Sequence, residues 1–235
     1  MLIRYFFALS LYVILGSINL CLAQTSAQIL DFSRAAKFDD PGQVRALLTA
    51  GISPNTVDAK GEPMLVIAIR DKSALVTELL LNQKSIDVDL SNLNGETPLM
   101  MASIAGDLPV VKKLVLEKKA KVDHIGWTPL HYACAKGQVE VAQFLVANGA
   151  DVNARSLNGT TPLMMAAQSG NEILIKFLLD KGADIQLRNQ LGFSVIDIAE
   201  IYQKPWIAKG LESRWQKLYK EPYPGPNKNP PKDSS

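Results

Sequence analysis

The sequence predicts an all-α solenoid, in which similar pairs of helices stack side by side. Segments that begin at Gly95, Gly126 and Gly159 align with one another, as "GETPLMMASIAGDLPVVKKLV", "GWTPLHYACAKGQVEVAQFLV" and "GTTPLMMAAQSGNEILIKFLL". Weaker copies begin at Gly61 and Gly192. Self-similarity of this kind indicates a repeat architecture, because one unit cannot cover its own apolar face and needs a neighbour.

The period of the repeat is the second observation. One apolar residue recurs in every copy with spacings of 34, 31, 33 and 33 residues, namely at Leu65, Leu99, Leu130, Leu163 and Ile196. A chain of 235 residues is also long enough to bury a sizeable core without disulfides.

The first 23 residues differ from everything that follows. Arg4 precedes an apolar run over Phe6–Ile18, and Cys21–Ala23 places small side chains one and three positions before Gln24. This layout is typical of a secretory signal peptide, and its apolar run of about 13 residues is shorter than the ~20 that a membrane-spanning helix needs. We therefore predict a cleaved signal peptide over 1–23, with an uncleaved anchor as the alternative.

Two N-terminal capping helices are expected over 24–57. The stretch "DDPGQVRALLTAGISPN" reads as the second helix of a repeat, and "ILDFSRAAKFD" reads as its first helix. Repeats are then expected at about 58–91, 92–122, 123–155 and 156–188, with a partial copy at 189–205.

The copy at Gly126 shows what each motif residue does. Thr128 is placed to cap a helix N-terminus with its hydroxyl, and Pro129 follows at the first helical position, where it loses no hydrogen bond. Gly137 ends this short helix in a left-handed conformation. The segment "QVEVAQFLVANGAD" then predicts a second helix with one buried stripe, ended by Gly149.

Three copies depart from this pattern. The connection from Ala120 to Gly126 is three residues shorter than that from Ala150 to Gly159, which predicts a short hairpin before the third repeat. Pro63 stands where the capping threonine is expected, so that helix start should be less well capped. The copy at Gly192 lacks the Thr-Pro pair altogether.

The C-terminal part is expected to close the stack and then leave it. A capping helix is predicted over 206–221, because Trp206, Leu211, Trp215 and Leu218 supply an apolar face. The segment 222–235 contains five prolines and predicts a disordered or polyproline-like tail.

These segments closely resemble the ankyrin repeat, a helix–turn–helix–hairpin unit with the signature T-P-L-H-x-A. The resemblance covers roughly Gln43 to Glu200. With its N-terminal segment, the chain is similar to small exported bacterial ankyrin-repeat proteins. The resemblance implies that partner proteins bind the concave face, which the hairpin fingers and the first helix of each repeat form.

Mapped onto this sequence, the resemblance selects candidate binding residues. It places an apolar row at exposed helix positions, at Ile67, Met101, Tyr132, Met165 and Ile198. From this row, from the finger position before each helix and from the loop tips we select Trp127, Tyr132, Met101, Met165, Ile198, Phe193, His124, Ile125, Glu96 and Asn158. An exposed apolar strip marks interaction sites, and Trp and Tyr are enriched in binding hot spots; the alternative is that these side chains pack beneath the fingers.

Chemistry is not expected from this chain. His131 and Cys134 lie at positions where the sister repeats carry Met100 and Ser103, or Met164 and Ala167, so we interpret them as structural. A nucleophilic site needs a base and an orienting group, and zinc needs clustered ligands, neither of which the sequence offers. No cofactor, no metal and no enzymatic activity are expected.

Charge narrows the range of partners. A net charge of +2 gives no sign of nucleic-acid binding. The lysines at 112, 113, 118, 119 and 121 form a basic run that is either a solvated face or a weak contact for an anionic membrane surface. The sequence thus predicts a monomeric, exported adaptor, inhibitor or scaffold, periplasmic first and secreted second; a secreted effector acting on a host protein and a membrane-tethered scaffold are the alternatives.

Overall fold

The structure, a computed structural model, describes residues 24–226, so the predicted signal peptide and residues 227–235 of the predicted tail lie outside it. Within this range the helices are α2 (Ser26–Lys37), α3 (Pro41–Thr49), α4 (Met64–Arg70), α5 (Ala74–Leu81), α6 (Pro98–Ala105), α7 (Leu108–Lys112), the π-helix η2 (Lys113–Glu117), α8 (Pro129–Ala135), α9 (Val139–Ala147), α10 (Pro162–Ser169), α11 (Glu172–Asp180), α12 (Val195–Ile201) and α13 (Pro205–Tyr219).

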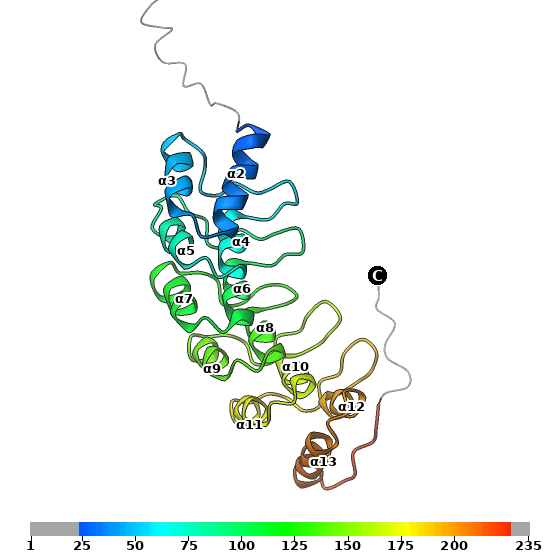
Figure 1. Cartoon of the computed structure of the whole chain (residues 1–235). Coiled ribbons are helices and arrows are strands. Elements are labelled where there is room, and N and C mark those ends of the chain that lie inside the picture. The colour runs from blue at the N-terminus through cyan, green and yellow to red at the C-terminus, as the bar shows by residue number, and fades with distance from the viewer. Residues whose placement is uncertain (1–23, 227–235) are drawn as a thin grey trace, which may run out of the picture.

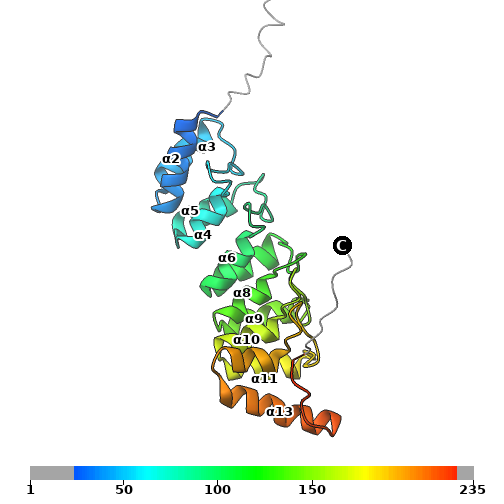
Figure 2. The ribbon, with the colours of Figure 1, turned by 90° about the vertical axis from the view of Figure 1, so that its right-hand side faces the viewer.

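The helices form two parallel rows. The inner row runs α2, α4, α6, α8, α10, α12, and each of its helices packs against the next one in the row. The outer row holds α3, α5, α7 with η2, α9, α11 and α13. Hairpin fingers project from the inner row on the side away from the outer row (Figure 1), and Figure 2 shows the same stack from the side. This arrangement confirms the predicted all-α solenoid.

The inner helices begin where the sequence pattern predicts. The hydroxyls of Thr97, Thr128 and Thr161 each accept a hydrogen bond from a backbone N–H of the first turn, and a proline follows each threonine. Pro63 precedes α4 without any side-chain cap, as expected. The start of α12 is better capped than the missing Thr-Pro pair suggests, because Ser194 and Asp197 form a reciprocal capping box.

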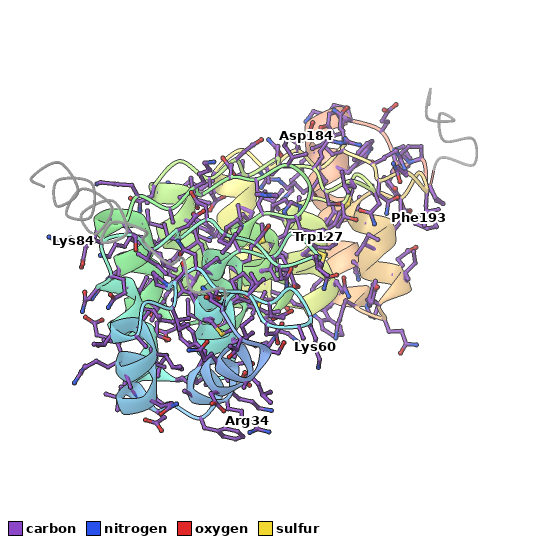
Figure 3. The ribbon with its side chains drawn as sticks, turned by 90° about the horizontal axis from the view of Figure 1, so that it is seen from above. Arg34, Lys60, Lys84, Trp127, Asp184 and Phe193 are labelled. Atoms are coloured by element: carbon purple, nitrogen blue, oxygen red, sulfur yellow. The ribbon has the colours of Figure 1, made fainter. Side chains whose placement is uncertain are left out.

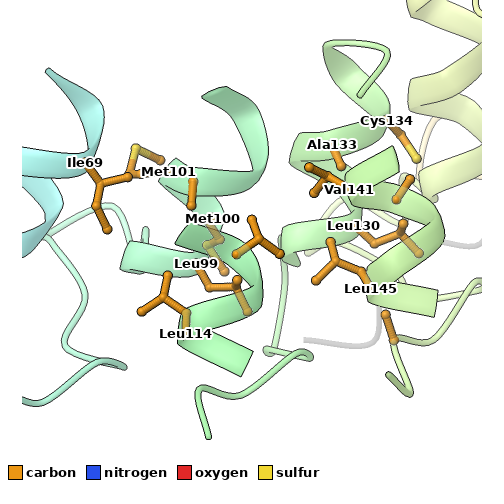
Figure 4. Packing of buried hydrophobic residues seen from close by; sticks show 14 of the residues in the cluster. Ile69, Leu99, Met100, Met101, Leu114, Leu130, Ala133, Cys134, Val141 and Leu145 are labelled. Atoms are coloured by element: carbon orange, nitrogen blue, oxygen red, sulfur yellow. The ribbon is translucent and has the colours of Figure 1, made fainter. Parts of the chain in front are cut away.

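The core lies between the two rows and runs through the whole stack. The recurring apolar residues Leu65, Leu99, Leu130, Leu163 and Ile196 are all at most 2% exposed. In Figure 4, Leu99 meets Leu114 and Leu130 meets Leu145, so each repeat closes its own inner–outer helix contact. Burying one such side chain contributes about 1.5–3 kcal/mol, which makes this ladder the main source of cohesion.

The second repeat contains an insertion that the sequence analysis did not identify. Leu114 and Ala120 are six positions apart, whereas their equivalents Leu145 and Ala150 are five apart. The extra residue is absorbed by η2, where the N–H of Lys118 donates to the carbonyl of Lys113. A π-turn accommodates a single inserted residue inside a helix.

The finger after this insertion is short, as predicted. Other fingers are closed by a backbone bond across the turn, from the N–H of Asn92 to Glu96 O at 3.1 Å and from the N–H of Ser156 to Thr160 O at 2.9 Å. No equivalent bond precedes Trp127 among the described backbone hydrogen bonds. The finger at residues 123–127 therefore lacks the turn that shapes its neighbours.

Neighbouring fingers are tied together at their bases. In four successive pairs, a side-chain oxygen of one finger accepts a backbone N–H from the next: Asn55 from Asp87, Asp89 from Lys121, Asp123 from Asp151 and Asn153 from Asp184. Because these bonds join residues about one repeat apart, they hold the spacing of the stack.

The C-terminal segment departs from the prediction. The helix α13 begins at Pro205, and residues 222–226, expected to belong to a disordered tail, pack back on the last repeat. The hydroxyl of Tyr223 donates to Asp197 Oδ2 and lies 2.6 Å from Ser194 Oγ, while Arg188 donates to the carbonyl of Gly225. Asp197 is nearly fully buried, so its carboxylate needs the Tyr223 hydroxyl, the Ser194 backbone N–H and the nearby Arg188 guanidinium to compensate for the loss of water.

Candidate partner-binding surface

His131 and Cys134 are structural, as the sequence pattern indicates. His131 is fully buried; its Nε2 donates to the carbonyl of Thr160 at 2.9 Å, and its Nδ1 accepts from the backbone N–H of Thr128. Burial lowers the pKa of His131 to about 4, so the ring is neutral and joins the third repeat to the fourth. Burial also raises the pKa of the Cys134 thiol, which keeps it protonated and unreactive.

The predicted apolar row on the inner helices is only partly exposed. Ile67 and Met101 are buried, which corrects the expectation for these two positions. Figure 4 shows the cause for Met101, whose side chain points toward Ile69 of α4 and so fills the contact between adjacent inner helices. Tyr132, Met165 and Ile198 are half-buried and pack against the edge of the core.

The fingertips carry the most exposed apolar side chains of the concave side. Leu93, Ile125, Leu157 and Leu191 stand on four successive fingers and are between 68% and 90% exposed. His124, beside Ile125, is exposed, and its Nδ1 lies 2.8 Å from the carbonyl of Ile125. Asn158 is also exposed, but its side chain accepts the N–H of Thr160 and the hydroxyl of Ser156, so part of its role is to shape the turn.

The short finger leaves an aromatic corner at the middle of the stack. Trp127 is 37% exposed, and its ring lies 6.1 Å from the ring of Tyr132 in an edge-to-face arrangement. Figure 3 shows Trp127 between Lys60 and Phe193 along the finger side of the molecule. Phe193, the equivalent residue of the last copy, is half-buried.

A row of hydrogen bonds runs from this corner toward the N-terminal end. The hydroxyl of Tyr132 donates to Glu96 Oε1 at 3.0 Å, and Asn92 Nδ2 donates both to Glu96 Oε2 and to Glu62 Oε1. Glu62 in turn is ion-paired with Arg70. Sequence reasoning selected Glu96 but missed this connection, although glutamate occupies the same finger position in two successive copies.

Beyond Arg70 the concave side deepens into a groove of about 930 Å³ between α2, the first finger and α4. Ile29, Leu30 and Val57 supply its apolar part, and Lys60 and Arg70 stand on its rim. Leu30 and Val57 are exposed. Aromatic corner, hydrogen-bonded row and groove therefore form one continuous surface on the finger side.

The outer row of helices carries exposed lysines around η2 and also exposed apolar side chains, namely Leu75, Leu116 and Ile173. Lys112, Lys119 and Lys121 are exposed, and Lys113 is paired with Glu78, which lowers the pKa of that glutamate. Among residues 24–226, no three potential metal ligands lie close enough together to hold an ion. No helix in that same range has the length and apolar character needed to cross a membrane.

Comparisons with known proteins agree with this architecture. Ankyrin repeat and SAM domain-containing protein 6 of Mus musculus is 35% identical over 112 residues, covering 46% of this chain and 13% of that protein. Palmitoyltransferase AKR1 of Lachancea kluyveri is 33% identical over 131 residues, which cover 53% of this chain and 18% of that protein. The B-cell lymphoma 3 protein homolog of Mus musculus is 32% identical over 127 residues, which cover 51% of this chain and 28% of that protein.

This chain thus matches only a minor part of each of these relatives. The family comparison covers far more of it, because the description "Ankyrin repeats (3 copies)" matches residues 32–125, 71–156 and 119–189. Together with the two rows of helices and the regularly spaced hairpin fingers, these matches establish that the chain belongs to the ankyrin-repeat family.

Proposed function

We propose that this protein is a non-catalytic interaction module that binds a partner protein through its concave face. Ankyrin repeats suggest such a role in general, and the observation that supports it here is the aromatic corner. Trp127 and Tyr132 stand where the finger is shortened, so two residues of the types that dominate binding hot spots are left partly exposed. The fingertips Leu93, Ile125 and Leu157 extend this apolar surface.

The finer assignment is an exported adaptor, inhibitor or scaffold that acts as a monomer. Support for export comes from residues 1–23, whose charge, apolar run and small residues follow the pattern of a signal peptide. The periplasm is the first location and the secreted state the second. Fractionation together with the N-terminal sequence of the mature protein distinguishes these from a membrane-tethered scaffold, which would retain the segment before Gln24.

The decisive experiment is affinity capture with tagged protein lacking residues 1–23. We expect Trp127→Ala combined with Tyr132→Ala to reduce partner capture by at least about tenfold, because truncating hot-spot aromatics commonly costs more than about 2 kcal/mol. The circular dichroism spectrum should stay unchanged, since both side chains are partly exposed.

Trp206→Ala is the matched control, because Trp206 is an exposed tryptophan on α13, outside the row of fingers. It should capture the partner as well as the original protein does. Equal capture by the double variant and the original chain would contradict the assignment of the concave face.

A further inference from the structure

We propose that the aromatic corner receives an arginine or lysine side chain of the partner protein, held between the rings of Trp127 and Tyr132 and the carboxylate of Glu96. This inference rests on the proposed function and adds the chemistry of the partner's anchoring residue. It follows from the charge, the ring geometry and the partial exposure of three side chains at one place on the concave face.

The charge at this place is not neutralised by the protein itself. Glu96 accepts hydrogen bonds only from neutral donors in the described contacts, the hydroxyl of Tyr132 and the amide of Asn92. No described lysine, arginine or histidine is ion-paired with Glu96, and neighbouring His131 is neutral. Each carboxylate oxygen has two acceptor sites, so Glu96 retains capacity for a charged donor.

Glu62 provides the contrast one repeat away. It occupies the equivalent finger position and shares Asn92 as a donor, but its carboxylate is already paired with Arg70. The two glutamates thus lie in one hydrogen-bonded row. Glu62 has a cation from its own chain, whereas no described ion pair involves Glu96. An incoming cation would complete at Glu96 the pairing that Arg70 provides at Glu62.

The rings beside Glu96 favour the same kind of ligand. Trp127 and Tyr132 meet edge to face at 69°, and the hydroxyl of Tyr132 is anchored on Glu96. Aromatic faces attract guanidinium and ammonium groups, tryptophan most strongly. A planar guanidinium can stack on a ring while its N–H groups reach a carboxylate, which makes arginine the better fit.

Only the third repeat combines these features. The equivalent pairs in the flanking copies are Glu96 with Met101 and Thr160 with Met165, and neither pair contains an aromatic residue. The finger before Trp127 is three residues shorter than the next one and lacks its closing backbone hydrogen bond among the described bonds, and the Trp127 side chain is 37% exposed. Aromatic rings, an unpaired carboxylate and partial exposure to solvent therefore coincide at one position in the stack.

The test uses N-acetyl-arginine methylamide as the probe, titrated into the protein while the indole N–H signal of Trp127 is followed by NMR. We expect a saturable shift that weakens as salt is added, and no saturable shift with the neutral analogue N-acetyl-citrulline methylamide. Glu96→Gln, which keeps the size of the side chain and removes its charge, should weaken the response about tenfold. Glu117→Gln removes the same charge from an exposed glutamate on η2, away from the fingers, and should leave the response unchanged.

Three outcomes would overturn this inference: no response to arginine, an equal response to citrulline, or equal weakening by Glu96→Gln and Glu117→Gln. Each can occur while Trp127→Ala with Tyr132→Ala still abolishes partner capture, in which case the concave face stands and only the basic anchor is wrong. If that double variant still captures the partner and still binds arginine, the assignment of the concave face as the binding surface is itself wrong.

Discussion

The buried imidazole of His131 shows how one side chain serves two repeats. Its Nδ1 accepts from the Thr128 backbone at the start of its own helix, and its Nε2 donates to Thr160 of the next finger. Met100 and Met164 occupy the equivalent positions in the sister copies, where Met100 Sδ replaces only the first of these contacts. The third repeat is thus joined to the fourth by a hydrogen bond that depends on a neutral ring.

This arrangement predicts a specific loss of stability in acid. An unfolded histidine has a pKa of about 6.5, whereas burial lowers the pKa of folded His131 to about 4. The contribution of neutral His131 to the free energy of unfolding is therefore complete above pH 6.5. It is lost as the pH falls toward 4, and the loss is about 3 kcal/mol at most. His131→Met should flatten this decline; urea unfolding at neutral pH and near pH 4.5 measures it, and an unchanged decline would refute this role of the ring.

At the scale of single elements, the outer helix of the second repeat carries the main irregularity. The insertion is absorbed by η2, and the chain then turns at Lys119 with a φ of 61°. The equivalent residues in the following repeats are Gly149 and Gly182, which have φ values of 96° and 90°. A residue with a Cβ is strained in this left-handed region by roughly 1–2 kcal/mol, whereas glycine is not.

Lys119→Gly should therefore stabilise the protein by about 0.5–1 kcal/mol, the strain relief being partly offset by the greater freedom of glycine in the unfolded chain. Lys118→Gly is the matched control, because Lys118 has helical backbone angles and should lose stability on the same change. Urea midpoints compare the two variants. Destabilisation by both would show that the left-handed turn at Lys119 carries no strain.

At the scale of the whole molecule, both ends of the stack are covered, and the C-terminal cover includes more than a helix. Trp215 of α13 contacts the ring of Tyr223 at 5.2 Å, and Tyr223 is bound to Asp197 at the start of α12. Stability in a solenoid is a sum of repeats and their interfaces. We therefore expect residues 220–226, which we call the C-terminal strap, to stabilise mainly the last repeat.

Tyr223→Phe should destabilise this end, because Asp197 is buried and loses a hydrogen-bond donor, at a cost of about 1–3 kcal/mol. Amide hydrogen exchange should quicken in α12 and α13 and stay unchanged in α6 and α8. Burial and Asp197 also raise the pKa of Tyr223 to about 12. The original protein should therefore lose the contribution of this hydroxyl to its stability as the pH rises from 10 to 12. The phenylalanine variant, which has no hydroxyl, should show no such loss. Uniform exchange along the chain would contradict a local strap.

Local sequence signals predicted a large part of the fold because each one acts within a few residues. Thr128 caps the helix that its own motif begins, Pro129 follows it, and the recurring apolar positions all lie in the core. The shortened finger was also predictable, since counting the residues from Ala120 to Gly126 is enough. These features depend on spacing and side-chain type, which one sequence displays directly.

The remaining features were decided by contacts between repeats, which no local pattern reports. Met101 is buried because the neighbouring helix α4 reaches it, and Tyr223 is ordered because Asp197 and Trp215 meet it from distant parts of the chain. Glu96, Asn92 and Tyr132 become one network only when successive fingers are stacked. The amino-acid sequence thus determined the repeat, its period and its caps, whereas only the tertiary structure decided which side chains of the concave face stay open, because neighbouring repeats set that exposure.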